Sequence, residues 1–321
     1  MTQQWHSCIT DELLKVEELI MRDLESENPE LTEMCQYVIA SGGKRIRPSM
    51  CILGFRACGG TEIQQAIEVG SAFEIIHSAT LVHDDINDQG DVRRGKKALH
   101  KQYTISKAII AGDFMFAMGF RLLASAAPQI VGYIVDASAS MGAGEFVQKD
   151  FEHASNVTEE DYIEIITGKT AKLLEASMKS GVAIANADMT QMEILGDYAF
   201  KVGLAFQIMD DTLDVIGDTR NTGKLVGTDM IEGKPTLPVI YAMSDPVHGK
   251  RIKEIFEKVD VTTDDVAEAV ELIRQTDAVE RCVEKAEGYS AQAKASLESL
   301  PGSVYKDALI DLADYVIRRN R

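Results

Sequence analysis

Along most of this chain the apolar residues recur at intervals of three and four, and only seven prolines interrupt its 321 residues. That spacing places apolar side chains on one face of an α-helix, whereas a half-buried strand needs strict alternation. No convincing series of alternating segments occurs, and no shift in composition or Pro/Ser-rich linker divides the sequence. The sequence therefore predicts an all-α protein with one large domain over residues 1–321.

Helices are expected wherever the three- and four-residue spacing persists. The expected ranges are Asp11–Leu24, Leu31–Ala40, Thr61 to the first aspartate cluster, Thr104–Ala126, Ile130–Phe151, Glu159–Ala185, Met189–Val215, Leu237–Met243, Thr262–Gln275, Val279–Leu297 and Tyr305–Arg319. The segments expected to be loops are Gln89–Lys97, Gly217–Pro235 and Ser244–Gly249. Two of these loops follow an aspartate-rich cluster, and loops on a rigid scaffold often carry function.

Two aspartate-rich clusters share one spacing and lie far apart in the chain. They consist of Asp84, Asp85 and Asp88 in the first segment and of Asp210, Asp211 and Asp214 in the second. The i, i+4 spacing places carboxylates on one helical face, where like charges repel and would weaken a bare helix. The repeated arrangement indicates a cation between the clusters. Carboxylate oxygens suit Mg²⁺, which proteins usually hold with one or two carboxylates and substrate phosphates.

Basic residues follow these clusters although the formal charge of the whole chain is -18. That charge argues against nucleic acid or an anionic membrane as the main partner. Arg93 and Arg94 come directly after the first cluster, Lys224 and Lys234 after the second, and a further basic segment spans residues 41–48. Guanidinium groups bind phosphate oxygens in a bidentate manner, so acid beside base suits a metal-bound diphosphate. Solvated loops without a ligand would explain either cluster alone equally well.

The five cysteines show no metal-ligand spacing, and an odd number does not suit a disulfide framework. We expect them to be reduced and the protein to be cytoplasmic. The N-terminal residues show no signal-peptide pattern, and no apolar run reaches the length of a transmembrane helix.

The motifs together resemble the trans-isoprenyl diphosphate synthase family. The matching segments are GGKRIRP, DDIND followed by RRG, GKT, FQIMDD, and GKxxGxD followed by EGKPTLP, in the family's order from residue 42 to residue 238. The resemblance implies an all-α bundle, the isoprenoid synthase fold, with the two aspartate motifs facing each other across a central catalytic cavity. It also implies Mg²⁺-dependent ionisation of an allylic diphosphate, attack by isopentenyl diphosphate and loss of a proton to the released diphosphate.

The resemblance assigns roles to individual residues. The catalytic residues would be Asp84, Asp85, Asp88, Asp210, Asp211 and Lys169. The metal ligands would be Asp84, Asp88, Asp210 and Asp214, with several Mg²⁺ ions in the site. The allylic diphosphate would be bound by Arg93, Lys169, Thr170, Gln207, Lys224 and Lys234. Isopentenyl diphosphate would be bound by Lys44, Arg47, His77 and Arg94. Asp113 and Gln148 would fall near the cavity, where they would support the residues that contact the substrates. Without the resemblance, a lone histidine such as His77 in an apolar helix would be taken as a core residue.

The residues before the first aspartate motif bear on product length. In short-chain relatives an aromatic residue four or five positions before the motif blocks the product tunnel, but this chain has Thr80 and Ala79 there. Ile76 and Ile75 continue that tunnel face without an aromatic residue, and Phe116 is a candidate for its floor. These residues favour a polyprenyl product longer than C20. The alternative is a geranylgeranyl or farnesyl diphosphate synthase.

More distant alternatives explain less of the sequence. A class I terpene cyclase or a squalene-synthase-like enzyme would not need GGKRIRP, and a non-catalytic partner subunit usually lacks the aspartate motifs. A purely structural helical protein would leave the acidic clusters without a role. The segment TGKT at residues 167–170 lacks the upstream glycine and strand of a nucleotide-binding loop. The resemblance favours a homodimer, with the apolar helix Thr104–Ala126 in its interface.

Overall fold

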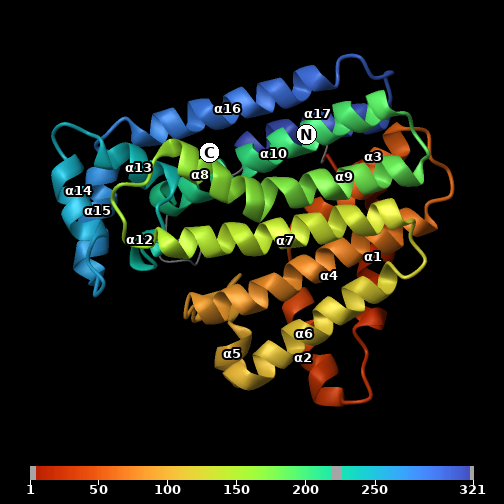
Figure 1. The fold of residues 1–321 in the computed structure, drawn as a ribbon, viewed down its shortest axis with the longest axis horizontal. Helices are drawn as coiled ribbons and strands as arrows, with labels where there is room; N and C mark the ends of the chain where they lie inside the picture. Colours follow the sequence, from red (N-terminus) through yellow and green to blue (C-terminus); the bar gives the residue numbers. More distant parts are fainter. Residues whose placement is uncertain (1–4, 218–225, 319–321) are drawn as a thin grey trace. The chain divides into compact units, whose positions relative to one another are not determined.

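The computed structural model describes residues 5–217 and 226–318, and its secondary structure is almost entirely helical (Figure 1). The all-α prediction is confirmed. No helix within these ranges is both long and apolar enough to cross a membrane. A two-stranded hairpin is the only sheet in the described part of the chain.

The elements follow one another in the order of their labels. They are η1 (Ser7–Ile9), α1 (Thr10–Asp23), α2 (Pro29–Ile39), α3 (Ile46–Ala57), α4 (Gln64–Asn87), β1 (Val92–Arg93), β2 (Lys96–Lys97), α5 (Leu99–Gln102), α6 (Ile105–Leu122), α7 (Pro128–Asp150), α8 (Glu159–Ile166), the π-helical turn η2 (Thr167–Ala171), α9 (Lys172–Ile184), α10 (Met189–Ile216), α12 (Thr228–Ile231), α13 (Leu237–Met243), α14 (Gly249–Phe256), α15 (Thr263–Arg274), α16 (Ala278–Ser296) and α17 (Val304–Arg318).

The chain divides into two compact units. Unit 1 contains residues 1–135, 176–196 and 300–308, and unit 2 contains residues 136–175, 197–299 and 309–321. The first aspartate cluster belongs to unit 1 and the second to unit 2. A single domain over the whole chain stays a prediction.

Helix α4 is the centre of unit 1. It packs against α1, α3 and α6, and 14 of its 24 residues are buried, which explains why it is apolar on nearly every side. Helices α4 and α6 lie side by side (Figure 1). They approach closely at Gly119, where an added Cβ atom would lie 2.6 Å from Cγ1 of Ile76. A residue with a side chain there would push the two helices apart.

Helix α3 is the longest element that the spacing did not predict. Nine of its twelve residues are buried, so no polar face interrupts its apolar residues and no helical period is visible. Arg45 precedes the helix in the left-handed conformation with φ 48°, and Pro48 lies in its first turn. Proline is tolerated there because the first N–H groups of a helix have no partner within the helix.

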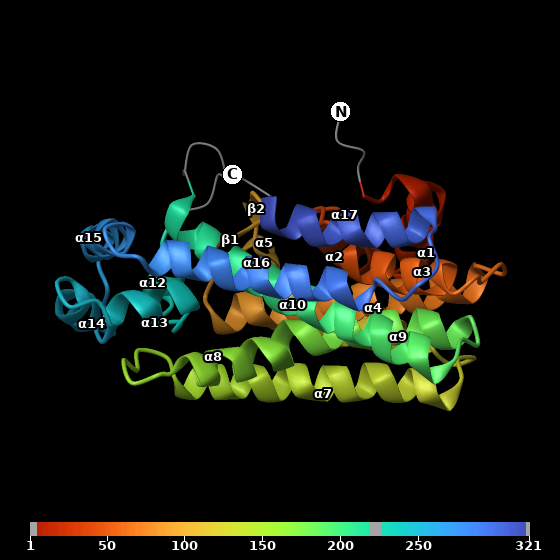
Figure 2. The same cartoon turned by 90° about the horizontal axis from the view of Figure 1, so that it is seen from above.

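In unit 2 the seven residues of α13 are all buried, and the helix packs against α14, α15 and α16. Figure 2 shows α14 and α15 beside α13. Helix α14 was not predicted either, although its buried residues Ile252, Ile255 and Phe256 lie three and four positions apart. Every range that was predicted to be helical contains a helix.

Three expectations were wrong in detail. The predicted loop Gln89–Lys97 contains the hairpin β1–β2, whose two short strands are too brief for an alternating pattern. The range Glu159–Ala185 is not one regular helix, because the turn η2 interrupts it. The described part of the loop Gly217–Pro235 contains the single helical turn α12.

Helix packing in unit 1 gives a direct stability test at Gly181 in α9. A Cβ atom there would lie 1.9 Å from the carbonyl oxygen of Cys51 in α3, so Gly181→Ala must displace backbone. We expect the free energy of unfolding to fall by about 1–3 kcal/mol. Gly132→Ala in α7 is the matched control, because no atom lies within 4 Å of its added Cβ. Urea unfolding should show this control at least as stable as the parent, since alanine favours helix over glycine by about 1 kcal/mol. Equal effects of the two substitutions would contradict the close contact of α3 and α9.

Candidate active site

The first aspartate cluster occupies the C-terminal end of α4. Asp84 and Asp85 lie in its last turn, and Asp88 caps it by donating its backbone N–H to the carbonyl of Asp84 at 2.8 Å. Carboxylates are unfavourable at this end, because the aligned peptide dipoles already make it negative. Asp85 is buried, whereas Asp84 and Asp88 are half-buried. The cluster therefore costs stability unless positive charge offsets it.

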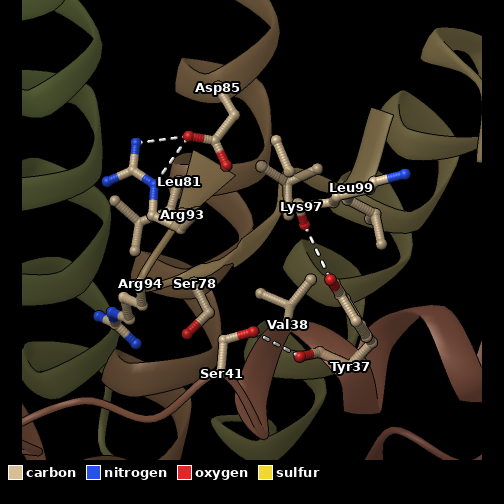
Figure 3. Close-up of a pocket in the computed structure, with 12 residues that line it drawn as sticks. Tyr37, Val38, Ser41, Ser78, Leu81, Asp85, Arg93, Arg94, Lys97 and Leu99 are labelled. Carbon is tan, nitrogen blue, oxygen red and sulfur yellow. Dashed lines mark hydrogen bonds and ion pairs between the residues drawn. The ribbon is translucent and has the colours of Figure 1, made fainter. Parts of the chain in front are cut away.

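Arg93 supplies part of that positive charge from the hairpin. Its Nε and Nη2 atoms lie 2.7 Å and 2.5 Å from Oδ1 of Asp85 (Figure 3). Burial alone would lower the pKa of Arg93, but the charge and hydrogen bond of Asp85, together with Asp84 and Asp88, raise it. All three carboxylates of the first cluster thus raise the pKa of this guanidinium.

The hairpin also explains why Arg94 points elsewhere. Arg94 and Gly95 form its two-residue turn with φ of 51° and 76°, and Val92 pairs with Lys97 while Arg93 pairs with Lys96. Two positive φ angles are typical of a type I′ turn, for which glycine is well suited. In Figure 3 Arg94 lies apart from Asp85, near Ser78 and Ser41. The segment RRG therefore directs two adjacent arginines to different surroundings.

Arg94 belongs to a group of positive charges around His77. The pKa of His77 is well below its ordinary value, because of burial and then of the nearby charges of Arg47, Arg94, Arg93 and Arg45. Its Nδ1 atom is buried and has no hydrogen-bond partner in the described part of the chain. Two further predicted isopentenyl diphosphate ligands, Arg47 and Arg94, thus lie close enough to His77 to lower its pKa. The fourth predicted ligand, Lys44, is exposed and follows Gly42 and Gly43 in the chain.

Arg45 has a different role from its neighbours. Its guanidinium pairs with Glu17, lies 2.9 Å from Oε1 of Glu74 and donates to the carbonyl of Ile39 at 3.0 Å. Glu74 is only 3% exposed, so Arg45 compensates a buried charge. An added Cβ on Gly43 would lie 2.9 Å from Nη1 of both Arg45 and Arg94, which explains the glycine between the two arginines.

The end of α2 holds the hairpin in place. Tyr37 donates its hydroxyl to the carbonyl of Lys97 at 2.9 Å, and Ser41 donates to the carbonyl of Tyr37 at 2.8 Å (Figure 3). These residues, with Arg93 and Arg94, line a pocket beside α4.

The second aspartate cluster occupies the C-terminal end of α10 in unit 2. Asp210 is exposed, and Asp211 and Asp214 are half-buried. Arg274 of α15 donates to the carbonyl of Val215 at 2.9 Å and 2.6 Å and to that of Gly217 at 3.2 Å. This arginine thus caps the last carbonyls of the helix and offsets their negative potential.

Asp211 is held by neutral hydrogen-bond donors. Tyr162 donates its hydroxyl to Oδ2 at 2.6 Å, and Gln207 donates Nε2 to Oδ1 at 2.8 Å. Thr170 in turn donates to Oε1 of Gln207 at 2.7 Å. Burial raises the pKa of Asp211, and so does Asp210, although the two hydrogen bonds and Lys169 oppose the shift. Tyr162 was not predicted from the sequence, since a buried tyrosine gives no local signal.

Asp214 accepts two backbone hydrogen bonds at the start of α12. Its Oδ1 and Oδ2 atoms accept from the N–H groups of Thr228 at 3.2 Å and Asp229 at 3.0 Å. The N–H of Lys234 then bonds the carbonyl of Asp229 at 2.8 Å, and its ammonium lies 2.7 Å from Glu232. Asp214 therefore fixes the segment that carries Lys234. Its predicted role as a metal ligand stays a prediction.

Lys169 and Lys224 are the remaining basic candidates. Lys169 lies in η2, where its ammonium pairs with Glu145 and donates to Oε1 of Gln148 at 2.9 Å. Lys224 lies outside the described residues.

The predicted tunnel residues lie on α4 and α6. Ile75, Ile76 and Ala79 have no exposed surface, whereas Thr80 and Phe116 are partly exposed. Thr80 donates its hydroxyl to the carbonyl of His77 at 2.8 Å, so the helix itself satisfies that polar group. Their part in product length stays a prediction.

The aspartates supply oxygen donors of the kind that Mg²⁺ prefers. Within residues 5–217 and 226–318 no group of three or more His, Cys, Asp or Glu side chains is arranged to hold a metal ion by itself. Mg²⁺ commonly takes only one or two carboxylates, with the rest of its ligands from substrate phosphates and water. The two half-buried carboxylates at the end of α4 fit that kind of site.

Comparison with known proteins identifies relatives along nearly the whole chain. A family model described as Polyprenyl synthetase matches residues 28–273. The all-trans-nonaprenyl-diphosphate synthase (geranyl-diphosphate specific) of Rhodobacter capsulatus is 32% identical, over 97% of this chain and 96% of that protein. A short chain isoprenyl diphosphate synthase of Methanothermobacter thermautotrophicus is 35% identical, over 94% and 95%.

The solved structure of a further related protein has the same fold as this chain. The polyprenyl synthase from Caulobacter crescentus CB15, crystallised with calcium and isoprenyl diphosphate, superposes with a TM-score of 0.94 at 33% identity. The match covers 99% of this chain and 98% of that one.

Arg45 and Arg94 both lie against Gly43. Substituting each in turn therefore compares an arginine with a structural role with one proposed to bind a ligand. Arg45→Met leaves the buried charge of Glu74 unpaired, so we expect the free energy of unfolding to fall by about 3–5 kcal/mol. In the described part of the chain the Arg94 side chain makes no hydrogen bond or ion pair, so Arg94→Met should change stability by less than about 1 kcal/mol. Urea unfolding measures both values. A larger loss in Arg94→Met than in Arg45→Met would contradict these roles.

Proposed function

Because the chain belongs to the polyprenyl synthetase family, we propose that it condenses isopentenyl diphosphate head to tail with an allylic diphosphate. The observation that carries this proposal is the division of charge at the hairpin of unit 1. Arg93 pairs with Asp85 of the first cluster, whereas Arg94 makes no ion pair in the described part of the chain and, with Arg47, lowers the pKa of His77. These are two chemically different sites for an anion.

The two sites suit two diphosphates. Carboxylates repel an anion unless a cation lies between them, so the first cluster suits a diphosphate that arrives with a metal ion. The guanidinium groups around His77 bind phosphate oxygens directly and need no metal. An enzyme that ionises a single diphosphate would need only the first site. Head-to-tail condensation needs both.

We propose several Mg²⁺ ions, with Asp84 and Asp88 as ligands in unit 1 and Asp210 and Asp214 as ligands in unit 2. The bound ions would supply charge neutralisation that makes diphosphate a better leaving group. Asp85 and Asp211 are better placed to support the site, because Arg93 holds the first and Tyr162 with Gln207 holds the second.

The residues of the chain then bind and orient the reactants. Arg93, Lys169, Lys224 and Lys234 neutralise the allylic diphosphate, while Lys44, Arg47, His77 and Arg94 hold isopentenyl diphosphate. The allylic C–O bond breaks, and the double bond of isopentenyl diphosphate forms the new C–C bond. A proton then leaves to the released diphosphate. Fixed charges aimed at a developing anion are usually the largest catalytic contribution.

For the product we propose a chain longer than C20. Relatives named nonaprenyl and octaprenyl diphosphate synthases support this length, as do the small side chains of Ala79 and Thr80. A second candidate is a shorter product, because a relative at 35% identity is named a short chain synthase and Ile75, Ile76 and Ala79 are fully enclosed.

We further propose that the protein is a homodimer, with helix α6 in the interface. Ile105, Ile109, Ile110 and Phe120 on this helix expose between 38% and 56% of their surface. Such a concentration of large apolar side chains on one helix is typical of a contact surface. The second copy of this chain would cover it.

We also propose a cytoplasmic location. All five cysteines are unpaired thiols in the described residues, and burial raises the pKa of Cys35 to about 12. Thiols of this kind are typical of a reducing compartment.

The reaction is tested with purified protein, farnesyl diphosphate, labelled isopentenyl diphosphate and Mg²⁺. We expect diphosphate release that depends on isopentenyl diphosphate, and labelled products longer than C20. Asp84→Asn and Asp210→Asn should each lower turnover by at least about 10²–10³-fold, the loss typical of one important charge-stabilising group. Asp260→Asn, at an exposed carboxylate before α15, is the control and should retain turnover.

Two results would count against the proposal. Near-normal turnover of Asp84→Asn or Asp210→Asn at saturating Mg²⁺ would refute the site. A product exclusively of C15 or C20 would refute the long-chain assignment and support the second candidate.

A further inference from the structure

Lys169 is held unusually close to helix α7. An added Cβ on Gly168 would lie 2.7 Å from the carbonyl oxygen of Ser140, and one on Gly144 would lie 3.2 Å from both N and Cγ of Lys169. Two glycines thus allow η2 and α7 to approach almost to backbone contact. A π-helical turn shifts the register of the side chains that follow it and is frequent at functional sites.

Two side chains of α7 bind the ammonium group of Lys169. Glu145 forms an ion pair with it, and Oε1 of Gln148 accepts a hydrogen bond from Nζ at 2.9 Å. Glu145 and Gln148 are three residues apart and therefore share one face of the helix. The ammonium is fixed by two acceptors rather than left on a mobile stem.

The bond to Lys169 also fixes the orientation of the Gln148 amide. An ammonium group only donates, so the amide must present its oxygen to Lys169 and its nitrogen to the other side. Gln148 is only 9% exposed, and its Nε2 is buried with no hydrogen-bond partner in the described part of the chain. A buried N–H group without an acceptor is costly, so an acceptor from a ligand would satisfy it.

The cavity beside this amide indicates what that ligand is. Gln148, Lys169, Gln207, Lys234 and Thr236 line it, together with Asp211 and with Asp229, whose pKa is raised well above its ordinary value by burial and by Asp214. The hydroxyl oxygen of Thr236 is also buried without a described partner. Both oxygens of Asp211 already accept hydrogen bonds, from Tyr162 and Gln207. Two ammonium groups, an amide N–H and a hydroxyl suit a ligand with several negatively charged oxygens.

We propose that Gln148 binds the allylic diphosphate directly through its Nε2 group. Its Oε1 atom fixes Lys169, so one amide aligns the ammonium and donates a second hydrogen bond to the same diphosphate. Glu145 is a positioning residue that acts through Lys169. This inference rests on the proposed prenyl transfer and adds a substrate contact to it.

The substitution Gln148→Glu separates the two functions of the amide. Glutamate keeps an acceptor for Lys169 but has no donor for the diphosphate. We expect its KM for farnesyl diphosphate to rise by about 10- to 100-fold, as for a lost hydrogen bond to a charged group. The KM for isopentenyl diphosphate should change less than about twofold, since that substrate is proposed to bind at other residues. Gln148→Met, which fills similar space without polar atoms, should raise the same KM.

The control is Asp150→Asn, at an exposed carboxylate near the end of the same helix, and it should leave both KM values unchanged. An unchanged KM for farnesyl diphosphate in Gln148→Glu would overturn the direct contact, and equal rises of both KM values would overturn its selectivity. Calorimetric binding of inorganic diphosphate with Mg²⁺ provides a readout without turnover. If the parent protein binds diphosphate but makes no product, the prenyl-transfer proposal fails. Weaker diphosphate binding in Gln148→Glu would then still support the contact, and unchanged binding would refute it.

Discussion

Carboxylates at the negative ends of two long helices are the constraint on which the site depends. Asp84, Asp85 and Asp88 end α4, and Asp210, Asp211 and Asp214 lie in the last two turns of α10. Helix dipoles and like charges both oppose this placement. The surrounding residues offset part of the cost. Arg93 pairs with Asp85, Tyr162 and Gln207 bond Asp211, backbone N–H groups bond Asp214, and Arg274 caps α10.

The compensation divides each cluster into two kinds of aspartate. Within each unit at least one carboxylate is held by neighbouring groups that fix its orientation, as Asp85 and Asp211 are. Asp84 and Asp210 come directly before these residues and are more exposed. The held aspartates give the helix ends a defined geometry, and the more exposed ones are suited to a metal ion. A similar division applies to the arginines, since Arg45 compensates Glu74 while Arg94 lies in a cationic group.

Much of this could be predicted from the sequence, and the exceptions have physical causes. Helical spacing predicted the long amphipathic elements, because their polar and apolar faces differ. It missed α3, which is buried on most sides and so shows no period. The motifs predicted which charged residues form the site, but not which other residues hold them in position. Tyr162, Glu145 and Arg274 act from other elements of the fold, so no spacing in the chain relates them to Asp211, Lys169 or the end of α10. The hairpin that separates Arg93 from Arg94 depends on two φ angles, which RRG alone does not reveal.

The central claim is that the two diphosphates are bound by different physical means, one with a metal ion and one by cationic side chains alone. Calorimetric titration of the parent protein with each substrate, with Mg²⁺ and then with a chelator, measures this most directly. The account predicts that removing Mg²⁺ abolishes binding of farnesyl diphosphate but leaves the affinity for isopentenyl diphosphate nearly unchanged. Equal dependence of both substrates on Mg²⁺, or none for either, would contradict it.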